Sequence, residues 1–327
     1  MKIKQVILQA FHDQPDRFIS GEELSQTCGC SRTAVWKHIE ELRRDGYEVE
    51  AVRKLGYRLL TAPDRLSAAE ITAGLGTKNI GQHVYAYDEV VSTQPLAHDA
   101  AAKGAVEGTL VLAEQQTGGK GRLGRPWHSP KGTGIWMSLI VRPAIPLPKT
   151  PQMTLLTAVC VARTIREETG LPVKIKWPND IFIGDKKVCG ILTELNAESD
   201  RVNYLVIGIG LNVNSVESDF PEELAQVGTS LRIESGQAIS RVRFIQQFCR
   251  IFEETYEQFL LEGFQPIKSE WEAYSYTIGR LVTLQTISQK LEGRAIGLNE
   301  EGVLLVEDEQ GLVHKVYSAD VNYRANE

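Results

Sequence analysis

The chain has 327 residues, of which 42% are apolar and 24% are charged, and its net charge is −6. This composition is typical of a soluble globular protein, excludes binding of nucleic acid through overall charge, and at this length predicts two or three domains. No apolar run approaches a membrane span and the start is not a signal peptide, so we expect a cytoplasmic protein without membrane contact. The five cysteines are scattered, which favours reduced thiols. Cys28 and Cys30 are too close for the usual zinc pair, so no metal bound directly by the protein is expected.

Charge is divided unevenly along the chain. Residues 1–62 carry ten Lys and Arg against nine Asp and Glu, a net charge of +1, and the remainder carries 26 against 33, a net charge of −7. Any contact with nucleic acid should therefore lie at the amino end, on a local patch.

The first sixty residues predict a helix-turn-helix with a β-hairpin wing. Apolar residues repeat at helical spacing over 3–11, a capping box begins a second helix at 20–23, and Ser31 caps a third helix over 32–46. The alternating segment 47–60 then turns near Gly56, as a wing does. A plain three-helix packing module with solvated basic residues is the alternative.

We favour DNA binding, because the polar amino-terminal end of the third helix is where such helices contact bases. A basic wing would add phosphate contacts. The predicted DNA-contacting residues are Arg32, Thr33, Trp36 and Lys37 on the helix, and Arg53 and Lys54, with Arg58, on the wing. Residues 61–66 form a short linker, and the predicted domain spans 1–63.

A second domain, predicted over 64–277, mixes strands and helices. Several strands are joined by short turns, such as the one at 183–187, which indicates an antiparallel or mixed sheet and an α+β fold rather than a doubly wound one. Strand-like runs lie at 109–114, 134–141, 173–177, 188–195 and 204–213, and helical stretches at 93–103, 151–169 and 241–262.

Two nucleotide-binding motifs are tested and rejected. In a P-loop, Ser or Thr follows the Gly-Lys pair, but Lys120 is followed by Gly121. The segment "GIGLNV" at 208–213 lacks the third glycine of a dinucleotide fingerprint, and no helix follows it. We interpret it as strand packing or as a close approach of backbone to ligand.

What remains is "GGKGRLGRPW" at 118–127, whose glycines allow backbone N–H groups to converge on an anion. A flexible surface loop is the alternative. A second element favours an anion site: Lys176 ends the apolar run at 173–177, where alternation turns it inward. A desolvated lysine needs an anionic partner. Alone it would more often form a salt bridge, but beside a basic glycine loop a catalytic role is favoured.

Four segments together resemble the biotin–protein ligases: "VVSTQ" at 90–94, "QQTGGKGRLGRPWHS" at 115–129, "KWPND" at 176–180 and "GIGLNVN" at 208–214. With the helix-turn-helix start, the likeness is to the bifunctional biotin ligases and biotin-operon repressors, and it spans essentially the whole chain. The loop departs from its common form at two positions. Lys120 stands where arginine is usual and cannot make the same planar contact, and Gly118 replaces a frequent alanine.

The resemblance implies that biotin and ATP, with Mg²⁺ on the triphosphate, form biotinyl-5′-adenylate and pyrophosphate in one pocket. Lys176 and Arg122 are implied as catalytic residues that position and neutralise two anions. Trp127 could equally be structural. The implied biotin-binding residues are Ser92, Thr93, Gln94, Gln116, Lys120, Gly121, Arg122, Trp127 and Lys176, and the implied nucleotide-binding residues are Lys120, Arg122, Arg125 and Asn212.

The resemblance further implies transfer of biotin to a lysine of the biotin carboxyl carrier protein of acetyl-CoA carboxylase. It also implies repression of biotin genes at an operator by a homodimer that the adenylate promotes. The last predicted domain, 278–327, contains short antiparallel strands, and the family has an SH3-like β-barrel there.

Two alternative functions remain open from the sequence. A lipoate–protein ligase shares the catalytic fold, but should lack the DNA-binding start and a polar pocket matched to a urea. A ligand-sensing repressor without ligase activity is the other, although the presence of Lys176 and Arg122 argues against it.

Overall fold

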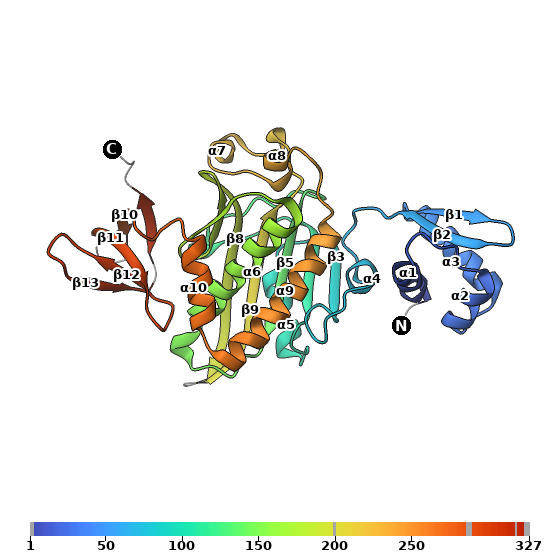
Figure 1. Cartoon of the computed structure of the whole chain (residues 1–327), viewed down its shortest axis with the longest axis horizontal. Helices are drawn as coiled ribbons and strands as arrows, with labels where there is room; N and C mark the ends of the chain where they lie inside the picture. Colours follow the sequence, from blue (N-terminus) through green and yellow to red (C-terminus); the bar gives the residue numbers. More distant parts are fainter. Residues whose placement is uncertain (1–2, 199–200, 286–289, 318, 324–327) are drawn as a thin grey trace.

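The structure is a computed structural model that describes residues 3–198, 201–285, 290–317 and 319–323. Figure 1 shows three bodies in a row, with a large central one between a helical amino-terminal domain and a carboxyl-terminal sheet. The predicted boundaries at 63/64 and 277/278 fall between secondary-structure elements. In the described part of the chain, no helix has the length and apolarity to cross a membrane.

The amino-terminal domain is a winged helix-turn-helix, as predicted. Both of its predicted caps are present, because the hydroxyls of Ser20 and Ser31 accept hydrogen bonds from the backbone N–H of Glu23 (3.1 Å) and Ala34 (3.2 Å). Gly29, at a φ of 62°, ends the second helix in the left-handed region. The elements are α1 (Ile3–Asp13), α2 (Gly21–Cys28), α3 (Arg32–Arg44), β1 (Glu48–Val52) and β2 (Gly56–Thr61).

The central domain is built on a seven-stranded mixed sheet with the order β3-β4-β5-β9-β8-β7-β6. Only β3 and β4 pair in parallel and the other neighbours are antiparallel, which confirms the α+β prediction. The strands are β3 (Val84–Val90), β4 (Leu110–Gln116), β5 (Gly134–Val141), β6 (Val173–Lys176), β7 (Asp180–Ile183), β8 (Lys186–Glu198) and β9 (Arg201–Asn212).

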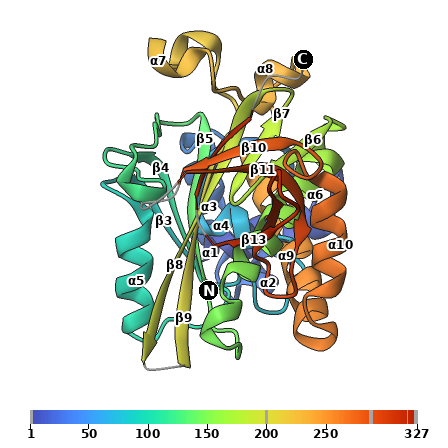
Figure 2. The same cartoon turned by 90° about the vertical axis from the view of Figure 1, so that its left-hand side faces the viewer.

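Helices cover both faces of this sheet (Figure 2). The long apolar helices α6 (Pro151–Thr169) and α9 (Arg241–Glu262) pack together on one face and bury the main core, with α10 (Gln265–Tyr274) beside them. Helix α5 (Thr93–Ala102) covers the other face through a smaller cluster. The remaining short helices of this domain are α4 (Ala68–Thr72), η1 (Arg122–Gly124), η2 (Leu147–Lys149), η3 (Glu217–Asp219), α7 (Glu222–Ala225) and α8 (Leu231–Ser235).

Helix α4 joins the amino-terminal and central domains. The Tyr47 hydroxyl of the winged domain donates to the buried Glu70 carboxyl on α4. Gln246 of α9 donates to the carbonyls of Glu70, Ile71 and Ala73. Burial raises the pKa of Glu70 above its usual value.

The carboxyl-terminal domain is a five-stranded antiparallel sheet with the order β13-β12-β11-β10-β14. The predicted short antiparallel strands are therefore confirmed. Their bounds are β10 (Leu281–Gln285), β11 (Lys290–Leu298), β12 (Leu304–Glu307), β13 (Val313–Val316) and β14 (Asp320–Tyr323).

Candidate functional site

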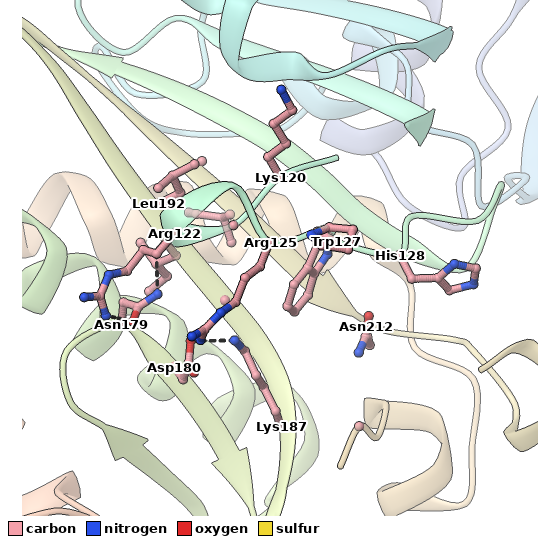
Figure 3. A pocket seen from close by; sticks show the side chains of 18 of the residues that line it. Lys120, Arg122, Arg125, Trp127, His128, Asn179, Asp180, Lys187, Leu192 and Asn212 are labelled. Atoms are coloured by element: carbon pink, nitrogen blue, oxygen red, sulfur yellow. Dashed lines mark hydrogen bonds and ion pairs between the residues drawn. The ribbon is translucent and has the colours of Figure 1, made fainter. Parts of the chain in front are cut away.

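A cavity of about 540 Å³ lies where the glycine-rich loop, the central sheet and the carboxyl-terminal domain meet. All the residues predicted to bind ligand line it, together with the 215–228 segment and residues of β14 (Figure 3). The structure thus brings together Ser92, Thr93, Gln94, Gln116, Lys120, Gly121, Arg122, Arg125, Trp127, Lys176 and Asn212.

One part of the cavity wall is a connected group of polar, mainly uncharged side chains. Thr93 begins α5, and its backbone N–H donates to Gln116 Oε1 (2.9 Å), while its hydroxyl lies 2.8 Å from Ser138 Oγ. Ser138 in turn donates to Gln94 Oε1 (2.7 Å), and Gln94 Nε2 donates to Glu194 Oε2 (2.9 Å). This buried network fixes several amide and hydroxyl groups at the cavity wall.

Two glycines of β9 make room for side chains of the cavity wall. A Cβ atom at Gly208 would lie 2.8 Å from Gln94 Oε1, and one at Gly210 would overlap the Trp127 indole. The "GIGLNV" segment is therefore a packed strand, consistent with the strand-packing interpretation. The Trp127 Nε1 atom is buried and has no hydrogen-bond partner in the part of the chain that the structure describes.

The glycine-rich loop folds into a tight backbone-bonded turn. Gly121 N donates to Arg125 O and Trp127 N donates to Gly119 O, both at 2.8 Å. A Cβ atom at Gly119 would lie 2.8 Å from Trp127 O, and one at Gly118 would lie 3.0 Å from the Val91 side chain. Close packing thus explains the glycine at 119, whereas a side chain at 118 would need only the Val91 side chain to shift.

Cationic side chains occupy another part of the cavity wall. Arg122 Nη1 donates to Asn179 Oδ1 (3.1 Å), and Lys187 Nζ lies 2.7 Å from Asp180 Oδ1 and 5.1 Å from the Trp127 ring centre. Figure 3 shows Arg125 directed toward the same carboxylate.

Lys120 differs from the other predicted cations. It is exposed, and its side chain points away from the Arg122 and Arg125 side chains in Figure 3. The loop thus presents its charges in two directions.

Lys176 ends β6 on the cavity side of the sheet. The neighbouring Ile175 is buried against the helices, and alternation places Lys176 on the opposite face. Its Nζ atom lies 4.8 Å from the Tyr323 ring centre and 5.4 Å from that of Phe182. Burial raises the pKa of Tyr323 above its usual value, so the phenol stays neutral beside the ammonium.

Sequence reasoning missed several residues of the wall. Asn179 and Asp180 lie inside the "KWPND" motif, which was a usable signal for them. Lys187 only follows a hairpin turn, and the carboxyl-terminal residues reach the cavity through tertiary packing, so neither carries a local signal. The missed residues include Asn179, Asp180, Lys187, Phe220, Leu224, Val227, Gln285, Val321 and Asn322.

The predicted DNA-contacting residues form an exposed surface on the winged domain. Arg32, Thr33, Trp36 and Lys37 lie exposed at the start of α3, and Arg53 and Lys54 lie exposed at the wing turn. Trp36 is 52% exposed, which is unusual for tryptophan.

Arg58 of the wing also has contacts within the domain. Its guanidinium pairs with Glu50 (2.7 Å) and lies over the Phe18 ring, and its contact with phosphate stays a prediction.

No group of three or more His, Cys, Asp or Glu that could hold a metal ion occurs among the described residues.

Family models match three parts of the chain: an HTH domain at residues 4–58, the biotin/lipoate A/B protein ligase family at 90–212, and a biotin protein ligase C-terminal domain at 277–323. Among solved structures, the biotin protein ligase from Aquifex aeolicus in complex with biotin and ATP is similar, with a TM-score of 0.65 and 30% identity. The match covers 75% of this chain and 100% of that one.

Two curated relatives match nearly from end to end. The bifunctional ligase/repressor BirA of Bacillus subtilis (strain 168) is 50% identical over 319 residues, 98% of each chain. The protein of the same name from Escherichia coli (strain K12) is 30% identical over 310 residues, 95% of this chain and 94% of that one. The chain therefore belongs to the family of bifunctional BirA ligase/repressors, within the biotin/lipoate A/B protein ligases.

Proposed function

We propose that this biotin–protein ligase joins biotin to ATP in the cavity described above and transfers the biotinyl group to a lysine of a biotin carboxyl carrier protein. The observation that carries the proposal is that one cavity is lined both by fixed uncharged hydrogen-bonding groups and by cationic side chains. Biotin has the matching asymmetry, with a urea at one end and a carboxylate at the other.

In the uncharged part of the wall, fixed amide and hydroxyl groups suit a urea, because each can be matched without desolvating a charge. Trp127 lines the cavity and covers the apolar part of biotin. We assign biotin binding to Ser92, Thr93, Gln94, Gln116, Lys120, Gly121, Arg122, Trp127 and Lys176.

In the cationic part of the wall, Lys176 and Arg122 hold the biotin carboxylate and the α-phosphate together. A carboxylate oxygen attacks the α-phosphorus, the bond to the β-phosphate oxygen breaks, and pyrophosphate leaves with the electron pair. No protein nucleophile is needed, so the residues act by positioning and charge neutralisation. Lys120, Arg122, Arg125 and Asn212 are assigned to the nucleotide, and Mg²⁺ enters on the triphosphate.

In the second step, the ε-amine of the acceptor lysine attacks the carbonyl carbon of biotinyl-5′-adenylate. The bond to the phosphate oxygen breaks, AMP leaves, and the amine loses a proton. The acceptor protein supplies this nucleophile.

We propose that the same adenylate is the corepressor. Exposed residues on α3 and on the wing read an operator, namely Arg32, Thr33, Trp36, Lys37, Arg53 and Lys54. A single helix-turn-helix makes few base contacts, so tight binding requires two copies on a two-fold symmetric site. We assign the homodimer to the adenylate-bound state, the location to the cytoplasm, and the domains to 1–63, 64–277 and 278–327.

Pyrophosphate release measured in parallel with biotin and with lipoate tests the ligase assignment. Lipoate has a carboxylate but no urea, so the uncharged part of the cavity wall should reject it. We expect release with biotin and ATP and little release with lipoate. Equal release with the two acids would contradict the proposal and favour a lipoate ligase, and no release with either would favour a repressor without ligase activity.

A further inference from the structure

The backbone on both sides of Lys176 is held by the segment that leads into the carboxyl-terminal domain. Tyr276 N donates to Ile175 O (2.8 Å), and Trp177 N donates to the hydroxyl of Thr277 (3.0 Å). Thr277 is fully buried. The strand end that carries Lys176 therefore has a fixed position relative to residues 276 and 277.

The Lys176 side chain itself passes between two aromatic rings from different domains. Its ammonium lies over Phe182 of β7 in the central domain and over Tyr323 of β14 in the carboxyl-terminal domain. A cation at these distances from a ring centre is attracted by the ring quadrupole. Because a lysine side chain has many rotamers, such contacts restrict where the ammonium can be found.

The Tyr323 ring is itself fixed. Its hydroxyl lies 2.8 Å from the hydroxyl of Thr277, which is the group that binds the backbone beside Lys176. The Tyr276 ring packs edge-on against Tyr323 at 5.0 Å and stacks on Phe182 at 5.9 Å. The Arg280 guanidinium covers the Tyr276 ring at 3.7 Å. The rings form one aromatic group, Phe182, Tyr276 and Tyr323, that connects the two domains beside Lys176.

We propose that Tyr323 is a positioning residue for adenylation, which holds the Lys176 ammonium in place at the cavity. The inference rests on the role proposed above for Lys176. Val321 and Asn322 of β14 line the cavity, and the Tyr323 ring contacts the Lys176 ammonium. Tyr323 thus acts through the lysine rather than on the substrates.

The experiment compares variants of the full-length chain in single-turnover formation of adenylate. Tyr323→Leu removes the ring. It should lower the rate constant for adenylate formation by about 5- to 30-fold, the range expected for a partly desolvated cation–ring contact. The KM for biotin should change less, because the contribution of a positioned charge grows in the transition state. Tyr323→Phe keeps the ring and should restore most of the rate. Tyr317→Leu, an exposed tyrosine of the same domain, is the matched control.

A double-mutant cycle with Lys176→Ala distinguishes a positioning role of Tyr323 from a general effect on stability. In that background Tyr323→Leu should have little further effect, and Phe182→Leu should follow the same pattern as a second test of the rings. A Tyr323→Leu rate within twofold of the parent would overturn the inference, as would a Tyr323→Phe variant as slow as Tyr323→Leu. If Lys176→Ala formed adenylate at the parental rate, the function proposed for that lysine would instead be wrong.

Discussion

Lys174 and Lys176 stand two residues apart on β6, yet only one of them lines the cavity. Lys174 is exposed, whereas Lys176 is half-buried between aromatic rings at the end of the strand. This pair provides a matched comparison at the scale of single residues, since each variant removes one lysine from the same strand.

Lys176→Ala should lower the rate of adenylate formation by about 10²–10³-fold, which is typical for the loss of one preorganised charge stabiliser. The fold should remain intact, because the side chain ends in the cavity. Pyrophosphate release under saturating substrates measures the effect, with Lys174→Ala as the control. A Lys176→Ala rate within a few-fold of the parent would show that the lysine does not bridge the two anions.

Arg122→Gly should weaken retention of the adenylate more than its formation. Arg122 fastens the glycine-rich loop to the sheet through Asn179, and loss of a charged hydrogen bond costs about 1.5–3 kcal/mol. The adenylate should therefore leave at least about tenfold faster and modify lysines of bystander proteins. Lys131→Gly, at an exposed position beyond the loop, is the control. An unchanged adenylate off-rate would exclude this role for the loop.

Where a motif was continuous, the sequence predicted which segments line the cavity. Residues of "QQTGGKGRLGRPWHS" and "KWPND" meet there as expected, and their roles stay predictions. Tyr323 could not be found in this way, because it lies 147 residues after Lys176 in the chain and meets it only through packing of two domains.

At the scale of elements, helices α6 and α9 could be predicted because each has a long apolar pattern. The capping box at 20–23 also marked where α2 begins. The short β7 was omitted, because its apolar run covers only residues 181–183, between the turn-forming segment 178–180 and Gly184. Helix α10 is a further element that the sequence reading omitted, and it leads directly to the segment that holds Lys176.

Helix α9 also anchors the turn that precedes β3. The Glu253 carboxylate accepts hydrogen bonds from the backbone N–H groups of Lys78 (2.7 Å), Asn79 (2.7 Å) and Ile80 (3.0 Å). Burial alone would raise the pKa of Glu253, but these three bonds outweigh burial and hold it below its usual value. The ionised form therefore stabilises the folded chain at neutral pH.

Glu253→Gln should lower the free energy of unfolding by about 1–2 kcal/mol at pH 7. Because the folded pKa of Glu253 lies below the unfolded one, its contribution is complete above about pH 4.3 and is lost as the pH falls through the folded pKa. The difference between parent and variant should thus shrink in acid. Urea unfolding from pH 7 down to about pH 3 measures it, with the exposed neighbour Glu254→Gln as the control. A difference that grows in acid would contradict the assignment.

At the scale of the whole molecule, buried Arg241 connects the interdomain linker to the ligand cavity. Its guanidinium pairs with Asp64 of the linker (2.9 Å) and with Glu114 of β4 (2.7 Å). Glu114 also accepts from Leu66 N (2.7 Å) and lies two residues before Gln116 of the cavity wall. These contacts form a continuous path from the cavity toward the winged domain.

Arg241→Gln should destabilise the chain by about 3–5 kcal/mol, because it leaves two carboxylates without their buried partner. Chemical denaturation of the full-length chain measures the loss. Arg232→Gln, at an exposed position on α8, should change stability by less than about 1 kcal/mol. Equal stability of the two variants would show that the Arg241 contacts do not hold the linker to the central domain.

We propose above that the adenylate made in the cavity controls whether the chain is a monomer or a dimer, and this is the central claim. The glycine-rich loop and the 215–228 segment both line the cavity, so a ligand that reaches biotin and nucleotide positions contacts more of the wall than biotin does. Ordering these segments and completing a dimer surface would then stabilise each other. Sedimentation velocity of the protein alone, with biotin, and with biotin plus ATP tests this most directly. We predict that the dimer dominates only with biotin plus ATP, and the same sedimentation coefficient under all three conditions would contradict the account.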